Sequence, residues 1–129
     1  MRPATLPGDR QGKANIARMI RVDQAGELGA AEIYRGQLAV LKDQSCADLL
    51  LEMAEQERAH LATFDEIMAE RGVRPTALSP LWRVAGFALG AGSALLGERA
   101  AMATTVAVEE VIEGHYQKQL DELAAESTG

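Results

Sequence analysis

Three glutamates occupy positions where the local pattern otherwise places apolar side chains. Glu27, Glu57 and Glu109 each fall on a stripe of Leu, Met, Ile or Phe that recurs every three or four residues. Burying an isolated carboxylate is costly, so a carboxyl group in such a position is usually paired, protonated or bound to a metal ion. Most of the other acidic residues are interpreted as solvated helix faces.

Glu57 begins an E-x-x-H motif that ends at His60. On a helix these two positions share a face, so a carboxylate oxygen and an imidazole nitrogen can reach one ion. The motif by itself is common and is more often structural or solvated than metal-binding. Met53 and Phe64 bracket it on the same face, which predicts that both polar groups point inward. The remaining histidine, His115, completes no second motif, because Ile112 stands three residues before it.

The elements that would position these residues are helices. Only 4% of the residues are aromatic, and the apolar content is mostly Ala, Leu, Val and Met, which favours helices over a sandwich or barrel. We predict one all-α domain over residues 15–126 behind a flexible lead-in over residues 1–14. Its helices are expected over about 15–42, 46–71, 80–97 and 98–125.

Local signals mark the ends of these helices and their buried faces. Ser45 is expected to cap the second helix and Gly72 to end it. Ser79 followed by Pro80 predicts the start of the third helix. Leu49 is assigned to the buried stripe of the second helix. In the first helix, poor helix formers suggest close approach of a neighbouring helix: Gly26, Gly29 and Gly36.

The third helix contains an uncharged run of 14 residues, from Val84 to Gly97. A membrane-spanning helix needs about 20. The run is therefore either a core helix or an apolar surface that lies in or against a bilayer. Arg83 stands beside Trp82 at its start, where it is either an interfacial residue or an ordinary surface arginine.

Length and charge limit the class of protein. The 129 residues fit one domain, and the net charge of −6 argues against a nucleic-acid binder. It is compatible with acidic ligands for hard cations. The single cysteine, Cys46, excludes an intramolecular disulfide and a cysteine-based zinc cluster. The N-terminus has no apolar core of signal-peptide length, so we expect an intracellular protein.

Two inward glutamates beside an E-x-x-H are part of the ferritin-like di-iron arrangement, which uses one Glu from each of two helices and an E-x-x-H from each of two others. In this context the sequence resembles the demethoxyubiquinone hydroxylases, di-iron monooxygenases of ubiquinone biosynthesis. The resemblance covers about residues 16–120, and the matching runs occur in order: RVDQAGE at 21–27, IYRGQLAVL at 33–41, QERAHL at 56–61, RPT at 74–76, PLW at 80–82, GFALGAG at 86–92, TVAVEE at 105–110 and HY at 115–116.

The resemblance implies that iron is bound by four residues: Glu27, Glu57, His60 and Glu109. It implies two iron ions per complete site, NADH as electron donor, and insertion of one oxygen atom from O2 into the ring of a demethoxylated ubiquinone precursor. It places the third helix at a membrane-facing quinone channel, and the protein peripherally on the cytoplasmic face of a bacterial plasma membrane. The expected partners are the quinone, the membrane surface, and either a second copy of the chain or other ubiquinone-biosynthesis proteins.

The chain departs from the family by lacking its second Glu-x-x-His, which predicts a C-terminally incomplete bundle. Three residues beside the site keep more than one interpretation each. Asp23 is a partner of a ligand or a surface residue. His115 and Tyr116 either donate to a ligand carboxylate or line the quinone path, and for Tyr116 the alternative is a core tyrosine with a satisfied hydroxyl.

The missing motif leaves two further functional hypotheses. Two copies of the helix pair carrying Glu27 and Glu57/His60 would together supply two single glutamates and two Glu-x-x-His motifs. A symmetric dimer would then form a ferroxidase-like, iron-binding site at its two-fold axis. The other hypothesis is an inactive truncated scaffold whose exposed apolar surface drives self-association.

Overall fold

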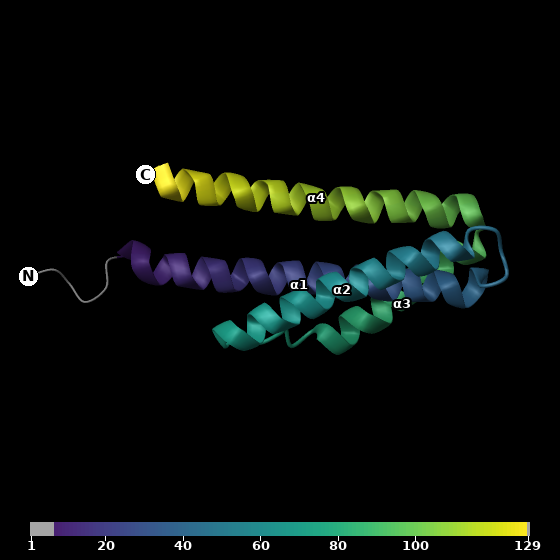
Figure 1. The fold of residues 1–129 in the computed structure, drawn as a ribbon, viewed down its shortest axis with the longest axis horizontal. Helices are drawn as coiled ribbons and strands as arrows, with labels where there is room; N and C mark the ends of the chain where they lie inside the picture. Colours follow the sequence, from purple (N-terminus) through teal and green to yellow (C-terminus); the bar gives the residue numbers. More distant parts are fainter. Residues whose placement is uncertain (1–6, 129) are drawn as a thin grey trace, which may run out of the picture.

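The computed structural model describes residues 7–128, which fold into four helices and no strand. They are α1 (Pro7–Leu41), α2 (Ala47–Arg71), α3 (Ser79–Leu95) and α4 (Glu98–Thr128). Helix α1 is central: α4 runs antiparallel along one side of it, and α2 and α3 lie on the other (Figure 1). The predicted all-α, ferritin-like class is confirmed.

Helix α1 begins at Pro7, earlier than the predicted start at residue 15. The flexible lead-in is therefore wrong for residues 7–14, and residues 1–6 of that prediction lie outside the described residues. Proline is favoured in a first helical turn, which fits a helix that starts at Pro7. Two glycines, Gly8 and Gly12, obscured this pattern in the sequence.

The helix ends agree with only part of the predicted signals. Gly72 ends α2 in the left-handed conformation, with φ 65°, as predicted. Ser45 does not cap α2, since Cys46 occupies the N-cap and Ser45 Oγ instead donates to Glu98 Oε1 at 3.1 Å. Helix α3 begins at Ser79 itself, one residue before the predicted start. The chain around Ser45 is thus tied to the first turn of α4.

Helices α1 and α3 cross at glycines that allow their backbones to touch. A Cβ atom on Gly90 would lie 2.7 Å from the carbonyl carbon of Ile33, and one on Gly36 would lie 2.8 Å from the backbone nitrogen of Ala91. The predicted close approach is confirmed at Gly36, and also at Gly29, where the indole of Trp82 lies over the glycine. It is wrong at Gly26, where no described atom lies within 4 Å of an added Cβ.

A buried polar residue joins three of the helices. Gln37 of α1 is fully buried, and its Nε2 donates to the Ala101 carbonyl of α4 at 3.0 Å and to Ser93 Oγ of α3 at 3.3 Å. Thr105 Oγ1 donates to Gln37 Oε1 at 3.2 Å. Because every polar atom of this amide has a partner, the network fixes α3 and α4 on α1 without leaving an unsatisfied group.

Near the C-terminal end of α1, the core includes Leu50 of α2, which is fully buried and packs with Leu41, Ala94 and Ala101. The prediction that Leu49 belongs to the buried stripe is wrong, because half of its surface is exposed. The stripe of α2 is rotated by one residue at its start. Within residues 7–128, the backbones of α2 and α4 do not approach each other, so these two helices meet only through side chains, such as those of Leu50 and Ala101.

Candidate metal centre

Two carboxylates and one imidazole meet between α1 and α2. Glu27, Glu57 and His60 each offer one ligand atom, and these atoms all lie within 4.8 Å of one another. His60 Nδ1 is 3.6 Å from Glu27 Oε2 and 3.7 Å from Glu57 Oε2. Both glutamates are buried, whereas the His60 side chain is 60% exposed. The prediction that Glu57 and His60 share a face is correct, but only the glutamate points fully inward.

Glu109 of α4 lines the same pocket, of about 280 Å³, from the opposite side. It lies outside the three-residue group, and the hydroxyl of Tyr34 donates to its Oε1 at 2.5 Å. Glu109 is close enough to Glu57 to raise the pKa of that carboxyl. The pocket is therefore formed by acidic side chains from three helices, with one imidazole at its rim.

While both carboxyl groups are ionised, two buried carboxylate oxygens in this pocket have no hydrogen-bond donor among the described residues: Glu27 Oε2 and Glu57 Oε2. An unsatisfied buried acceptor is expensive, and two of them beside each other repel as well. Burial raises the pKa of Glu57 well above its usual range, and the neighbouring carboxyls of Glu27 and Glu109 raise it further. Glu57 therefore keeps its proton at neutral pH unless a cation takes the place of that proton.

Two tyrosines each donate to one carboxylate oxygen of the acidic pocket. Tyr116 donates to Glu27 Oε1 at 2.5 Å, and its ring stacks on Phe64 with centroids 6.5 Å apart. Burial raises the pKa of both Tyr34 and Tyr116, and the carboxylates they face raise it further, so both remain hydrogen-bond donors. Each tyrosine therefore fixes one carboxylate. The second oxygen of Glu27, which Tyr116 does not bind, faces His60.

Of the residues expected beside the site, Tyr116 contacts a candidate ligand, and Asp23 and His115 lie behind it. Asp23, His115 and Tyr116 line a small cavity of about 20 Å³. Burial raises the pKa of Asp23, although a hydrogen bond from Gln119 and the charge of nearby His115 partly oppose that rise. Asp23 Oδ1 is a further buried oxygen without a donor among the described residues. Asp23 is thus not an ordinary surface residue, while His115 is exposed.

Sequence reasoning missed the role of Tyr34. This residue was recognised only as a member of the first apolar stripe, yet it is fully buried and binds Glu109. The sequence did contain a signal for this role. Tyr34 follows Glu27 by two helical turns on one face, and a buried tyrosine hydroxyl normally finds a partner. That the partner would come from α4 could not be read from the spacing.

Comparison with known proteins places the chain in a family. Residues 14–129 match the sequence profile of the family described as Ubiquinone biosynthesis protein COQ7. The chain is 61% identical over 119 residues to the 3-demethoxyubiquinol 3-hydroxylase of Rhodospirillum rubrum, covering 92% of this chain and 56% of the relative. It is 54% identical over 118 residues to the mitochondrial NADPH-dependent 3-demethoxyubiquinone 3-hydroxylase of Mus musculus, covering 92% and 54%.

A more distant similarity extends to fungi. The chain is 50% identical over 113 residues to the mitochondrial 5-demethoxyubiquinone hydroxylase of Saccharomyces cerevisiae, covering 86% of this chain and 48% of the relative. The chain spans about half the length of these curated relatives. On the extent of the profile match and these identities, the chain belongs to the Ubiquinone biosynthesis protein COQ7 family.

Proposed function

We propose that this chain binds iron through Glu27, Glu57, His60 and Glu109. The observation that carries the proposal is the pair of buried, donorless oxygens of Glu27 and Glu57 facing one imidazole nitrogen. Carboxylate oxygens combined with imidazole suit iron, and bridging carboxylates offset the repulsion between two divalent cations. Glu109 would approach the second cation from α4, because it lines the same pocket.

We further propose that the iron site serves hydroxylation of a demethoxyubiquinone-type ring, the reaction named for the relatives. Bound iron would supply the redox chemistry that activates O2. The chain's own residues would hold the site: Tyr116 fixes Glu27, Tyr34 fixes Glu109, and Glu57 would lose its proton on binding a cation. The stacked rings of Phe64 and Tyr116 form an apolar wall on which a flat quinone ring can lie.

A membrane surface is the expected source of such an apolar substrate. Along α3 several large apolar side chains are exposed, including Leu81 at 65%, Val84 at 68% and Leu95 at 75%. No helix within residues 7–128 has the length and apolar content needed to cross a bilayer. We therefore propose that α3 lies against a membrane surface. We propose further that this surface is the cytoplasmic face of the plasma membrane, and that the chain binds other proteins of ubiquinone biosynthesis.

Iron loading is the direct test. The chain is loaded anaerobically with Fe(II), and the bound iron is measured by mass spectrometry after desalting. Glu57→Gln should weaken iron binding at least about tenfold, since it removes a ligand charge from the centre of the group. Glu110→Gln, one residue beyond Glu109 and exposed, is the matched control and should retain iron. Equal iron in the two variants would refute the ligand assignment.

The reaction has a separate test. Iron-loaded chain is given O2, a demethoxyubiquinone analogue and NADH, and the product is analysed by mass spectrometry. NADPH is compared in parallel, because the name of the mouse relative specifies it. Hydroxylated quinone that carries one atom of labelled O2 is the expected product. A fully loaded site that yields no hydroxylated quinone would exclude the hydroxylase activity for this chain.

The exposure of His60 favours a second candidate, a ferroxidase-like oligomer. The pocket opens toward solvent at His60, and the backbones of α2 and α4 do not close over it. Two chains facing each other would bring together two copies of Glu27 and of the Glu57/His60 pair. Sedimentation with iron analysis separates the candidates: one iron pair per dimer supports the oligomer, and iron-loaded monomers exclude it.

A further inference from the structure

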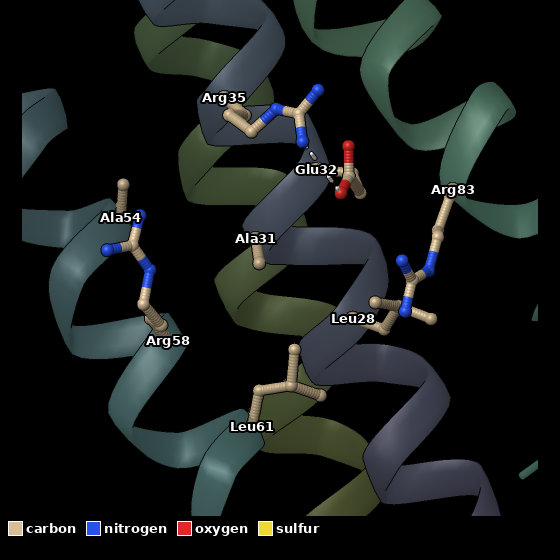
Figure 2. A pocket seen from close by; sticks show the side chains of 8 residues that line it. All are labelled: Leu28, Ala31, Glu32, Arg35, Ala54, Arg58, Leu61 and Arg83. Atoms are coloured by element: carbon tan, nitrogen blue, oxygen red, sulfur yellow. Dashed lines mark ion pairs between the residues drawn. The ribbon is translucent and has the colours of Figure 1, made fainter.

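Three arginines from three different helices line one groove that the proposed iron site does not use. Arg35 of α1, Arg58 of α2 and Arg83 of α3 line it around an apolar floor of Leu28 and Ala31, as Figure 2 shows. We refer to this feature, defined by Arg35, Arg58 and Arg83, as the arginine groove. It encloses about 190 Å³ and lies between α2 and α3, whereas the acidic pocket lies between α2 and α4.

The arginine groove carries uncompensated positive charge. Glu32 is the one acidic residue that lines it, and its Oε1 lies 3.6 Å from Arg35 Nη1. Among residues 14–125, no carboxylate forms an ion pair with Arg58 or Arg83. Three guanidinium groups against one carboxylate leave a net charge of about +2, on a chain whose total is −6. Guanidinium forks match phosphate oxygens in geometry, so the groove suits a phosphate group.

An apolar surface continues directly from these charges. A second cavity, of about 370 Å³, shares Glu32, Arg35 and Arg83 with the arginine groove and extends over Val84, Phe87 and Ala88 of α3. The guanidinium of Arg35 lies 5.3 Å from the centre of the Phe87 ring, which holds it at the junction between the two cavities. A ligand that fills both would combine a phosphate with an apolar chain.

We propose that the arginine groove binds the phosphate of an anionic phospholipid headgroup, with the acyl region lying along α3 over Val84 and Ala88. The proposal rests on the membrane docking of α3 given under Proposed function. Continuity of the groove with the exposed face of α3 favours a lipid over a soluble phosphate compound. The overall charge of −6 opposes binding to an anionic membrane, so the local cations of the arginine groove would have to face the surface.

Vesicle flotation tests the proposal with the 129-residue chain. One set of vesicles contains only phosphatidylcholine, and the other contains added phosphatidylglycerol. The test variant is Arg35→Gln/Arg58→Gln/Arg83→Gln, and the charge-matched control is Lys42→Gln/Arg99→Gln/Lys118→Gln, at exposed positions outside the groove. Circular dichroism verifies that both variants remain helical. Each arginine facing an anionic surface strengthens binding about fivefold, so the test variant should lose about 100-fold on the anionic vesicles.

Further measurements make the outcomes separable. The control should lose less than fivefold, and Glu32→Gln should strengthen anionic binding about fivefold, because it removes the only acidic group lining the groove. Wild-type protein that binds both vesicle types equally, or equal losses in the two triple variants, would overturn the headgroup site while leaving membrane docking intact. Wild-type protein that binds neither vesicle type would overturn both. Calorimetric binding of inorganic pyrophosphate that disappears in the test variant, with vesicle binding unchanged, would overturn the lipid in favour of a soluble phosphate ligand.

Discussion

Replacing Gly90 by alanine should destabilise the bundle, although alanine is the better helix former. The added Cβ would lie 2.7 Å from the carbonyl carbon of Ile33 and 2.8 Å from its Cα, about 0.7 Å short of the 3.4 Å at which ordinary contact begins. It would also collide with the carbonyl oxygen of Ile33. These atoms are backbone and cannot rotate away, so α1 and α3 must separate.

The cost of this separation can be weighed against the gain in helix propensity. A gap of 0.5–1 Å forfeits roughly a quarter to a half of each van der Waals contact across it, and overpacking of this kind costs about 1–3 kcal/mol or more. Alanine returns about 1 kcal/mol through its helix propensity. Because α1 and α3 touch at several glycines, we expect the upper end of the cost and a net loss of about 2 kcal/mol for Gly90→Ala.

Urea unfolding followed by circular dichroism measures this difference, with Gly92→Ala as control on the same helix. No described atom lies within 4 Å of an added Cβ at Gly92, so that variant should gain about 1 kcal/mol. For a chain of this size, the predicted loss in Gly90→Ala lowers the melting temperature by roughly 6–10 °C. If Gly90→Ala were as stable as Gly92→Ala, the backbone contact between α1 and α3 would not exist in solution.

Three more predictions concern the acidic pocket and the core. The pKa of Glu57 is raised in the folded protein, so unfolding releases its proton. The metal-free chain should therefore lose stability as pH rises from about 5 through neutral, by up to about 1.4 kcal/mol per pH unit. Urea unfolding across that range should show a weaker dependence of the unfolding free energy on pH for Glu57→Gln, and an unchanged dependence would contradict the assignment. Tyr116→Phe removes the hydroxyl that donates to Glu27 and should weaken iron binding about 10- to 100-fold, with little change in helix content. Competition with a chelator measures the iron affinity, and an unchanged affinity would mean that Glu27 needs no such support. Leu50→Ala should cost about 3 kcal/mol in urea unfolding and Leu49→Ala less than 1 kcal/mol, since only Leu50 is fully buried; equal costs would show that α2 is rotated differently.

The sequence by itself determined the helical class, the order of the helices and the acidic residues that meet in the pocket. These features depend on local periodicity, because the period of about 3.6 residues fixes which side chains share a face. It placed Glu27, Glu57 and Glu109 on apolar stripes before any contact between helices was known. The C-terminal end of α2 could also be predicted from a local signal, since Gly72 adopts the left-handed conformation that favours glycine.

Only the tertiary structure decided which side chains from different helices become partners. The spacing could not reveal that Tyr34 serves Glu109 or Tyr116 serves Glu27, because those pairs are 75 and 89 residues apart in the chain. The same holds for the α1–α3 crossing, where Gly36 meets backbone atoms and Gly26 meets none. Burial and unsatisfied hydrogen bonding depend on what a neighbouring helix brings, so the donorless oxygens of the acidic pocket and the uncompensated charge of the arginine groove exist only in the assembled fold.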